Sequence, residues 1–435
     1  MSSEWPMVAI EDVCELIVDC VNKTAPVVDR VTPYRMIRTT NVRNGRIDLT
    51  ECRHVEEATY KTWTRRAQLQ VGDVVLTREA PIGEVGFVTE AKGVFLGQRL
   101  MQYRANPKVL DSRYLLYCFL SPALQHQFGS HEGSGSVVSH IRVGDCFKFK
   151  LQLPPLNIQR KISQTLETLD DRITLLRETN ATLEAIAQAL FKSWFVDFDP
   201  VHAKMQGRAP EGMDEATAAL FPDSFEESEL GAVPKGWHDK SLDAVASFLN
   251  GLALQKFPPT GDKDLPVIKI AQLRKGDTVG ADLASRSIKP EYVIQNGDVL
   301  FSWSGSLEVE IWCGGEGALN QHLFKVTSEV FPKWFYFLWT RHHLEDFRQV
   351  AASKATTMGH IQRAHLTGAK VLVPSDGILR AANSVLEPII QRLIENSLQV
   401  NNLAALRDTL LPRLISGQLR LSELELISNA EALSE

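Results

Sequence analysis

Residues 153–195 read LPPLNIQRKISQTLETLDDRITLLRETNATLEAIAQALFKSWF and decide the fold of this chain. Apolar or small residues recur at alternating intervals of four and three from Ile162 to Trp194. This heptad period predicts a long helix that pairs with another helix as a coiled coil. Pro154 and Pro155 suit the first turn of such a helix, where the missing N–H of a proline is not needed.

The same heptad pattern returns at positions 386–414, and Gly417 directly after it predicts the end of the second helix. Three polar residues interrupt the two patterns: Asn180 in the first, and Asn396 and Arg407 in the second. A polar residue in a coiled-coil seam often fixes register at some cost in stability. Asn180 either has that role or marks a solvated end, and the sequence leaves both open. The residues predicted to form the coiled-coil core are Ile162, Leu166, Leu169, Ile173, Leu176, Asn180, Leu183, Leu190, Leu386, Ile389, Leu393, Val400, Leu403 and Leu410.

Comparison of the chain with itself reveals an internal repeat. Residues 36–45 match 267–276 at an offset of 231, and residues 72–76 match 297–301 at an offset of 225. From Ser139 onward the offset stays at 220. The two globular blocks therefore differ by loop insertions, whereas the helices that follow them keep one length. Because each helix follows its own domain in a single chain, antiparallel pairing of the helices predicts a pseudo-twofold molecule.

Each globular block has the pattern of an α+β domain. Segments 111–128 and 331–348 have the period of amphipathic helices, and Pro81–Glu84 has the composition of a hairpin turn. The predicted strands are Val74–Leu76, Val85–Thr89, Lys148–Leu153, Val299–Trp303, Val309–Cys313 and Lys370–Val373. The predicted fold class is therefore α+β, with two globular domains joined by two long antiparallel helices.

These patterns divide the chain into six parts. Residues 196–230 hold nine acidic residues against two basic ones and several prolines, which predicts an irregular, solvated linker between the two halves. The predicted boundaries are 1–152 for the first globular domain, 153–196 for the first helix, 197–235 for the linker, 236–374 for the second globular domain, 375–418 for the second helix and 419–435 for a tail.

Composition limits the classes of protein that the chain can belong to. The net charge of −6 is unusual for a DNA-binding protein, but residues 30–66 carry nine Lys and Arg against four acidic residues. A phosphate backbone responds to such a local basic face, not to the average charge of the chain. The six cysteines form no CxxC pair, and the sequence has neither a long apolar run nor a signal peptide. We expect a cytoplasmic protein with reduced thiols and no membrane association.

The segment Leu153–Leu156, the heptads after it and the run ALFKSWFVDFDPV at residues 189–201 resemble the specificity subunits of type I restriction-modification systems. The resemblance covers essentially the whole chain, and GAVPKGW at residues 231–237 adds to it. It implies that two target-recognition domains each read one half of a bipartite, asymmetric sequence in double-stranded DNA. It also implies that the helices set the spacing and dock two methylation subunits, with two restriction subunits in the full complex. One departure is the second helix start, where Pro374 is followed by Ser375 instead of a second proline.

Candidate DNA contacts are polar residues on loops around the repeated blocks. Arg pairs with guanine edges and Asn or Gln with adenine, whereas Ser, Thr and Lys more often hold phosphates. For any one of them, an ordinary surface or turn role is the alternative, and Arg78 could form a local ion pair with Glu79. The candidates are Arg38, Thr40, Asn41, Arg43, Arg78, Gln98, Arg99, Ser136, Ser139, His140, Lys269, Gln272, Arg274, Ser304, Gln321, Lys354, Thr356, Thr357 and His360.

We expect no catalysis by this chain alone. Neither Pro-Pro pair has the motif with which an amino-methyltransferase holds a flipped base, and no GxxxxGK[ST] phosphate loop is present. His342, His343 and Glu345 lack the spacing of metal ligands on a helix and are predicted to be a polar helix end. The resemblance implies that S-adenosylmethionine, ATP and Mg²⁺ belong to partner subunits. A self-contained modification enzyme and a coiled-coil adaptor that never touches DNA are the two alternatives.

Overall fold

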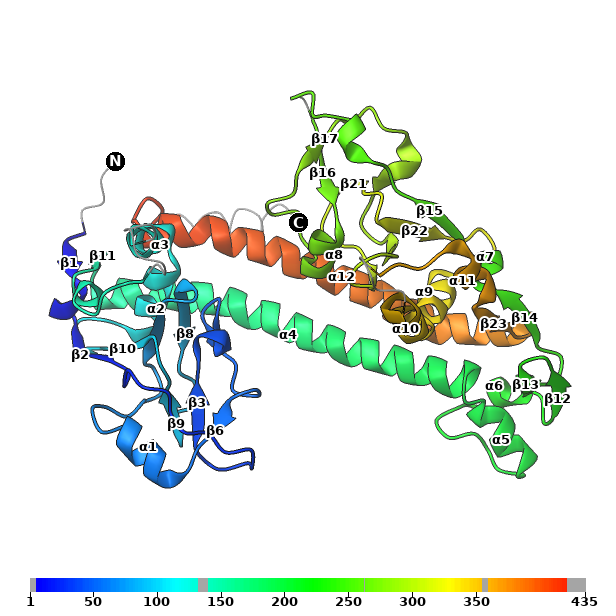
Figure 1. Ribbon diagram of the computed structural model, residues 1–435, viewed down its shortest axis with the longest axis horizontal. Helices are drawn as coiled ribbons and strands as arrows, with labels where there is room; N and C mark the ends of the chain where they lie inside the picture. Colours follow the sequence, from blue (N-terminus) through cyan, green and yellow to red (C-terminus); the bar gives the residue numbers. More distant parts are fainter. Residues whose placement is uncertain (1–4, 132–139, 262, 354–358, 421–435) are drawn as a thin grey trace, which may run out of the picture. The chain divides into compact units, whose positions relative to one another are not determined.

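The computed structural model describes residues 5–131, 140–261, 263–353 and 359–420. The chain divides into two compact units, which are described separately below. Unit 1 comprises residues 1–171 and 403–435, and unit 2 comprises residues 172–402. Two 40-residue helices, α4 (Leu156–Phe195) and α12 (Asp376–Ile415), each contribute residues to both units (Figure 1). At 1.5 Å per residue, each helix is about 60 Å long.

The core of unit 1 is a four-stranded antiparallel sheet with the order β2-β10-β7-β8. Its central strand β7 is buried at every position, as its apolar sequence VVLTR favours. The strands of this sheet are β2 (Cys14–Asp19), β10 (Leu100–Ala105), β7 (Val74–Arg78) and β8 (Ile82–Phe87). Smaller sheets are formed by β6 (Arg53–His54), β3 (Arg35–Ile37) and β9 (Val94–Leu96), by β1 (Met7–Ala9) with β11 (Lys150–Gln152), and by β4 (Val42–Arg43) with β5 (Arg46–Ile47). The short helices of unit 1 are η1 (Ile10–Asp12), η2 (Thr39–Asn41), α1 (Glu57–Trp63), α2 (Ser112–Leu120), α3 (Pro122–Gly129) and η3 (Asp145–Phe147).

Unit 2 repeats this architecture with the sheet order β15-β22-β19-β20. The strands of this sheet are β15 (Ser247–Asn250), β22 (Leu323–Thr327), β19 (Val299–Ser302) and β20 (Val309–Ile311). The second sheet contains β17 (Leu283–Ala284), β16 (Leu265–Ile268), β21 (Gly317–Leu319) and β18 (Val293–Ile294), and β14 (His238–Ser241) pairs with β23 (Lys370–Val373). The short helices are α7 (Leu242–Val245), η4 (Leu254–Lys256), α8 (Ile270–Lys275), η5 (Pro290–Tyr292), α9 (Lys333–His342), α10 (Leu344–Ser353) and α11 (Arg363–Gly368).

The two sheets correspond strand by strand and in register. Met101 lies opposite Leu76 in unit 1, and the residues at the predicted offsets, Phe324 and Phe301, lie opposite each other in unit 2. The second sheets each contain one parallel pair, β3 with β9 and β16 with β21. The internal repeat inferred from the offsets is therefore a repeat of structure, and the α+β fold class with two domains joined by a long helix pair is confirmed.

The segments 111–128 and 331–348, each predicted to be one amphipathic helix, are two helices each. Helix α2 ends at Leu120 and α3 begins at Pro122, because a proline cannot donate the N–H that would continue the first helix. In unit 2, α9 ends at His342 and α10 begins at Leu344.

Residues 197–235 are not the irregular linker that their acidic composition predicted. They form α5 (Asp199–Met205), α6 (Glu215–Leu220) and a hairpin of β12 (Phe225–Ser228) with β13 (Gly231–Pro234). Val201, Phe221 and Val233 from this segment are buried in the core of unit 2. The charged residues of the segment are solvated, as expected, but these spaced apolar side chains hold its backbone against the domain.

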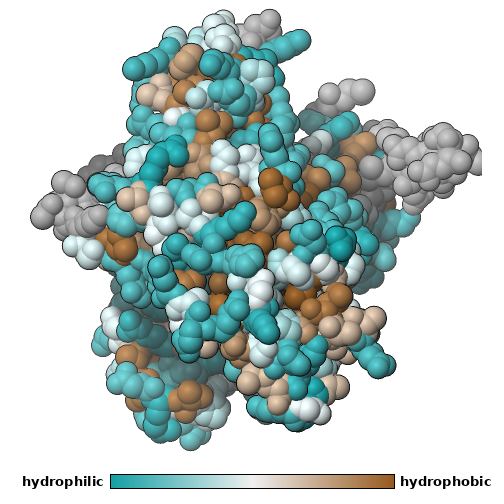
Figure 2. Space-filling model, turned by 90° about the vertical axis from the view of Figure 1, so that its right-hand side faces the viewer, coloured by the Kyte–Doolittle hydropathy of each residue, from teal (hydrophilic) through white to brown (hydrophobic). Residues whose placement is uncertain are grey.

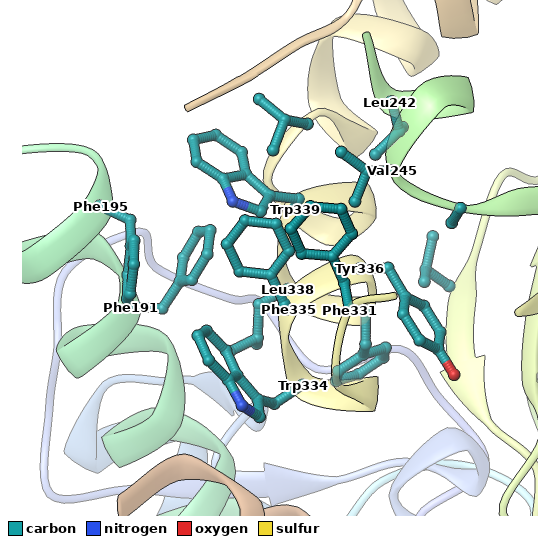
Figure 3. Packing of buried hydrophobic residues seen from close by; sticks show 14 of the residues in the cluster. Phe191, Phe195, Leu242, Val245, Phe331, Trp334, Phe335, Tyr336, Leu338 and Trp339 are labelled. Carbon is teal, nitrogen blue, oxygen red and sulfur yellow. The ribbon is translucent and has the colours of Figure 1, made fainter. Parts of the chain in front are cut away.

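An aromatic cluster joins the end of α4 to α9 within unit 2 (Figure 3). Phe191 packs edge-on against Trp339 with ring centroids 5.1 Å apart, and Phe195 lies 5.5 Å from Trp334. Figure 3 shows both phenylalanines directed from α4 toward the rings on α9. Aromatic pairs in this geometry add to the energy of burial, so the cluster fixes the second domain on its helix.

The predicted seam residues of α4 and α12 are all buried or half-buried. In unit 2, Nδ2 of Asn180 donates to the Leu393 carbonyl (3.1 Å) and to Oγ of Ser397 (3.0 Å), and Nδ2 of Asn396 donates to Oδ1 of Asn180 (2.9 Å). The Asn180 side chain is thus satisfied inside the helix pair and does not mark a solvated end.

In unit 1 the remaining polar seam residue is also paired. Nη1 of Arg407 on α12 donates to Oδ1 of Asp170 on α4 at 2.9 Å, and the hydroxyl of Tyr117 donates to Oδ2 of the same carboxylate at 2.9 Å. Moving from Asp170 to Asn180 along α4, the contacts on α12 move backward from Arg407 to Asn396. The two helices therefore run antiparallel.

The second helix ends where Gly417 predicted. Gly417 has a φ of +70°, and a Cβ there would lie 3.2 Å from the ring of Trp5. Glycine adopts this conformation without steric cost, and it is needed both for the turn and for the close approach of the Trp5 ring.

In the part of the chain that the structure describes, no helix is both long enough and apolar enough to cross a membrane. The face in Figure 2 carries mostly hydrophilic side chains, with hydrophobic ones scattered among them.

The Asn180–Asn396 pair gives a first prediction. Asn180→Leu leaves Nδ2 of Asn396 without its acceptor, so we expect the free energy of unfolding to fall by about 1–3 kcal/mol. The double variant N180L/N396L has no orphaned group and should recover most of that loss. Urea unfolding of both single variants and the double variant measures the coupling, with Thr182→Ala on the exposed face of α4 as the control. Strictly additive effects would contradict the pairing.

Candidate nucleic-acid interface

One edge of the main sheet of unit 1 gathers several of the predicted DNA contacts. Strand β7 ends at Arg78, and β10 begins directly after Gln98 and Arg99. The backbone N–H of Arg78 donates to the Arg99 carbonyl at 2.8 Å, and that of Ile141 donates to the Arg78 carbonyl at 2.9 Å. His140 therefore lies beside this edge. We call the residues Arg78, Glu79, Gln98, Arg99 and His140 rim 1.

The equivalent edge of unit 2 has the same backbone connections. The backbone N–H of Trp303 donates to the His322 carbonyl at 3.3 Å, and that of Ile361 donates to the Trp303 carbonyl at 3.0 Å. Ser304 forms an antiparallel bridge with His360. We call the residues Trp303, Ser304, Gln321, His322 and His360 rim 2. The structure thus brings Ser304, Gln321 and His360 together, as it does their counterparts in unit 1.

Arg78 is not available for DNA in this structure, contrary to the prediction. It is 8% exposed, and its Nη1 donates to the Ile141 carbonyl at 3.0 Å. The ion pair considered between Arg78 and Glu79 is also wrong, because Glu79 lies 3.5 Å from Nε of Arg99. Arg99 remains exposed and carries the cationic charge of rim 1.

Two of the predicted amide readers are helix caps instead. Oδ1 of Asn41 accepts the backbone N–H of Arg38 at 2.9 Å, and Oε1 of Gln272 accepts the backbone N–H of Lys269 at 3.3 Å. Asn41 is 5% exposed and Gln272 is 8% exposed. Both amides satisfy backbone groups at a short-helix start, which is the turn role that the sequence left open. We therefore withdraw both from the set of DNA contacts.

The neighbours of these caps are more accessible. Thr40 and Arg43 are exposed in unit 1, and Lys269 and Arg274 are exposed in unit 2. Nη1 of Arg43 donates to the Val42 carbonyl at 2.9 Å and lies 3.8 Å from Oε1 of Glu84, while Lys269 pairs with Asp282. Arg38 is half-buried over the Glu51 carbonyl, at 3.5 Å from Nη2. These side chains could hold phosphates, since exposed ion pairs contribute little and exchange readily.

Arg274 borders a cavity of about 580 Å³ within unit 2. Glu310 lines the same cavity, and burial, with the charges of Glu184 and Glu308, raises the pKa of its carboxyl group to about 7. The cavity walls carry charges of both signs, from Arg274 and Lys275 as well as from Glu184 and Glu308.

Five further candidates, Ser136, Ser139, Lys354, Thr356 and Thr357, lie outside the described residues, as does the Gly-Ser loop at 133–136.

Residue-type reasoning missed Trp303, His322 and Asn250. Nε1 of Trp303 donates to Oδ1 of Asn250 at 2.9 Å, and the Trp303 ring lies 5.9 Å from that of His322. The repeat alignment could have found two of them, because Trp303 is the counterpart of Arg78 and His322 that of Arg99. The bond from Asn250 joins distant strands and leaves no signal in the sequence.

We next consider the metal-ligating and nucleophilic side chains of the described residues. No group of three or more His, Cys, Asp or Glu side chains that could hold a metal ion occurs in the described ranges. Burial lowers the pKa of both His342 and His343, and Nε2 of His343 contacts the Lys370 carbonyl at 2.8 Å. Burial also raises the pKa of the Cys52 and Cys146 thiols to about 11, so neither is a thiolate at neutral pH.

The cap assignment can be tested on stability. Asn41→Ala leaves the backbone N–H of Arg38 without its acceptor, so we expect a loss of about 1–2 kcal/mol in the free energy of unfolding. Thr40→Ala, one residue away and exposed, should change it by less than about 0.5 kcal/mol. Urea unfolding of the two variants compares them. Equal effects would show that Asn41 is not a cap.

Comparison with known proteins is consistent with this geometry. The family model described as the type I restriction modification DNA specificity domain matches residues 2–185. The type I restriction enzyme MjaIX specificity subunit of Methanocaldococcus jannaschii is 26% identical over an alignment of 365 residues, and the match covers 81% of this chain and 79% of that protein. The HindI specificity subunit of Haemophilus influenzae is 24% identical over an alignment of 409 residues, and the match covers 81% of this chain and 87% of that protein.

The crystal structure of the S subunit of the type I restriction-modification system of M. genitalium superposes with a TM-score of 0.52 at 15% identity. The superposition covers 95% of this chain and 96% of that one, so the fold is shared along essentially the whole length. The resemblance inferred from the sequence is therefore confirmed: residues 2–185 match the family model of the type I restriction modification DNA specificity domain, and the chain is similar over four fifths of its length to type I specificity subunits.

Proposed function

We propose that this chain is the DNA-recognition subunit of a type I restriction-modification complex and has no catalytic activity of its own. In this proposal each globular domain reads one half of a bipartite, asymmetric sequence in double-stranded DNA. The helices set the distance between the half-sites and dock two methylation subunits, and two restriction subunits join them in the cytoplasm. S-adenosylmethionine, ATP and Mg²⁺ would be bound by those partners.

The observation that carries this proposal is that rim 1 and rim 2 have the same backbone arrangement. Rim 1 and rim 2 have equivalent main-chain hydrogen bonds, from Arg78 to Arg99 and from Trp303 to His322. Their side chains differ: the guanidinium groups of Arg78 and Arg99 in rim 1 are replaced at the same positions of rim 2 by the indole of Trp303 and the imidazole of His322. A shared scaffold with unlike side chains supports the reading of two unlike half-sites.

The polar side chains of the candidate interface fall into two classes, those suited to base edges and those suited to phosphates. Gln98 and Gln321 carry half-buried amides, which are matched to base edges in the major groove. The exposed Arg43 and Arg274, at equivalent positions, are matched to phosphates, which fix orientation without reading sequence.

Exposed apolar residues on α4 support docking of partner subunits. Leu175 is 54% exposed and Ile186 is 43% exposed. They are eleven residues apart, which places them on the same side of an α-helix. Apolar side chains aligned on an exposed helix face favour burial against another protein.

Exchange of one domain tests independent reading. Replacing residues 1–150 with the corresponding domain of another specificity subunit should change one half of the methylated motif and leave the other half and the gap unchanged. The measurement is sequencing of methylated bases in cells that express the chimera with the cognate methylation subunit. A change in both halves would contradict independent reading, and the absence of any motif for the unaltered chain would contradict the proposed function.

Lengthening the helices tests the ruler. Because α4 and α12 are antiparallel, one heptad is added to each at the same level, after Asp171 and after Asn402. The pair then grows by about 10 Å, or about three base pairs at 3.4 Å each. We expect the same half-sites with a longer gap in the methylated motif. The matched control adds the heptad after Leu419, beyond the helix pair, and should leave the gap unchanged; an unchanged gap in both variants rules the ruler out.

A further inference from the structure

The two rims contain one glutamine each at the same position. Gln98 lies just before β10 and Gln321 just before β22, at the offset of 223 that relates these strands. Both side chains are half-buried. An amide carries a donor end and an acceptor end, so what such a residue offers to DNA depends on which end a neighbour already occupies.

In unit 1 the acceptor end is occupied. Oγ1 of Thr24 donates to Oε1 of Gln98 at 3.2 Å. Within the described ranges of the chain, Nε2 of Gln98 has no hydrogen-bond partner. Gln98 therefore offers its two N–H donors.

In unit 2 the opposite end is occupied. Nε2 of Gln321 lies 3.3 Å from Nε2 of His322, and Nδ1 of His322 lies 2.9 Å from Oγ of Ser304. In this orientation of the Gln321 amide, its nitrogen donates and the ring Nε2 of His322 accepts, so in the neutral ring Nδ1 carries the proton and donates to Oγ of Ser304. Among the residues that the structure describes, Oε1 of Gln321 has no partner. Gln321 therefore offers its carbonyl oxygen and one remaining N–H.

The backbone and the ring of His322 each have a further partner. Its backbone N–H donates to Oδ1 of Asn320 at 3.2 Å, and its ring lies 5.9 Å from that of Trp303. Trp303 is itself fixed, because its Nε1 donates to Asn250 at 2.9 Å. The relay from Ser304 through His322 is thus a rigid support for the amide of Gln321.

On the basis of the proposed function, we propose that Thr24 and the Ser304–His322 pair are positioning residues that decide which end of each glutamine faces the DNA. Gln321 then presents an acceptor beside a donor, the pattern that matches N6 and N7 of adenine. Gln98, whose carbonyl oxygen is turned toward Thr24, presents its N–H donors, the pattern that matches the O6 and N7 acceptors of guanine. The same residue type at the same position of the repeat thereby reads a different base in each half-site.

Removal of each support tests the proposal. Thr24→Val removes the hydroxyl that occupies Oε1 of Gln98, and Ser304→Ala removes the group that sets the tautomer of His322. In either variant the amide is free to turn over, so discrimination at one base position should fall by about tenfold. T24V should relax one position of the first half-site only, and S304A one position of the second only. The readout is sequencing of methylated bases in cells that express each variant with the cognate methylation subunit.

Matched variants keep the hydroxyl: Thr24→Ser and Ser304→Thr should retain the unaltered motif. Gln98→Ala and Gln321→Ala should lose the preference at the same positions that T24V and S304A relax. If these alanine variants methylate the unaltered motif with unaltered preference, the proposal is overturned, while the motif itself upholds the proposed function. If S304A and T24V lower methylation equally at all sites, their role is structural and the positioning role is excluded.

Discussion

Burial of the apolar seam between α4 and α12 is the constraint on which the rest of this structure depends. Each helix is 40 residues long and has one apolar face, which water would otherwise cover. The polar residues in the seam do not break this pairing, because Asn396 donates to Asn180 in unit 2 and Arg407 pairs with Asp170 in unit 1. These partners meet only when the helices run antiparallel in one register. The seam therefore also fixes the direction and register of α12 against α4.

The features that the sequence predicted well are those with a local period or a repeated spacing. A heptad pattern depends on neighbours within two turns, and a constant offset can be found without knowledge of contacts. The helices and the duplicated domains could therefore both be predicted from the sequence. Residues 197–235 were not, because their acidic composition describes the solvated face only. The burial of Val201, Phe221 and Val233 depends on distant residues of the domain, and their irregular spacing gives no periodic signal.

For the candidate interface, residue type indicated the region but not the role. Asn41 and Gln98 are both amides in turns, yet one caps the backbone of its own turn and the other meets Thr24, 74 residues away in the chain. Arg78 ends a buried strand and points inward to the Ile141 carbonyl. A sequence motif cannot separate these cases, because the deciding quantities are burial and the identity of a distant partner. Only the three-dimensional arrangement supplies them.

The two copies of the domain have diverged in a way that a pseudo-twofold scaffold permits. Equivalent main-chain bonds keep each rim at the same place on its sheet, so the backbone need not change when the side chains do. The counterpart of the Arg99–Glu79 pair is the His322–Ser304 pair. Each pair joins the residue before one central strand, β10 or β22, to the turn after the neighbouring strand, β7 or β19. Exchange of such a pair alters charge and donor pattern without altering the fold. A duplicated domain can therefore acquire a second specificity while the seam between α4 and α12 stays unchanged.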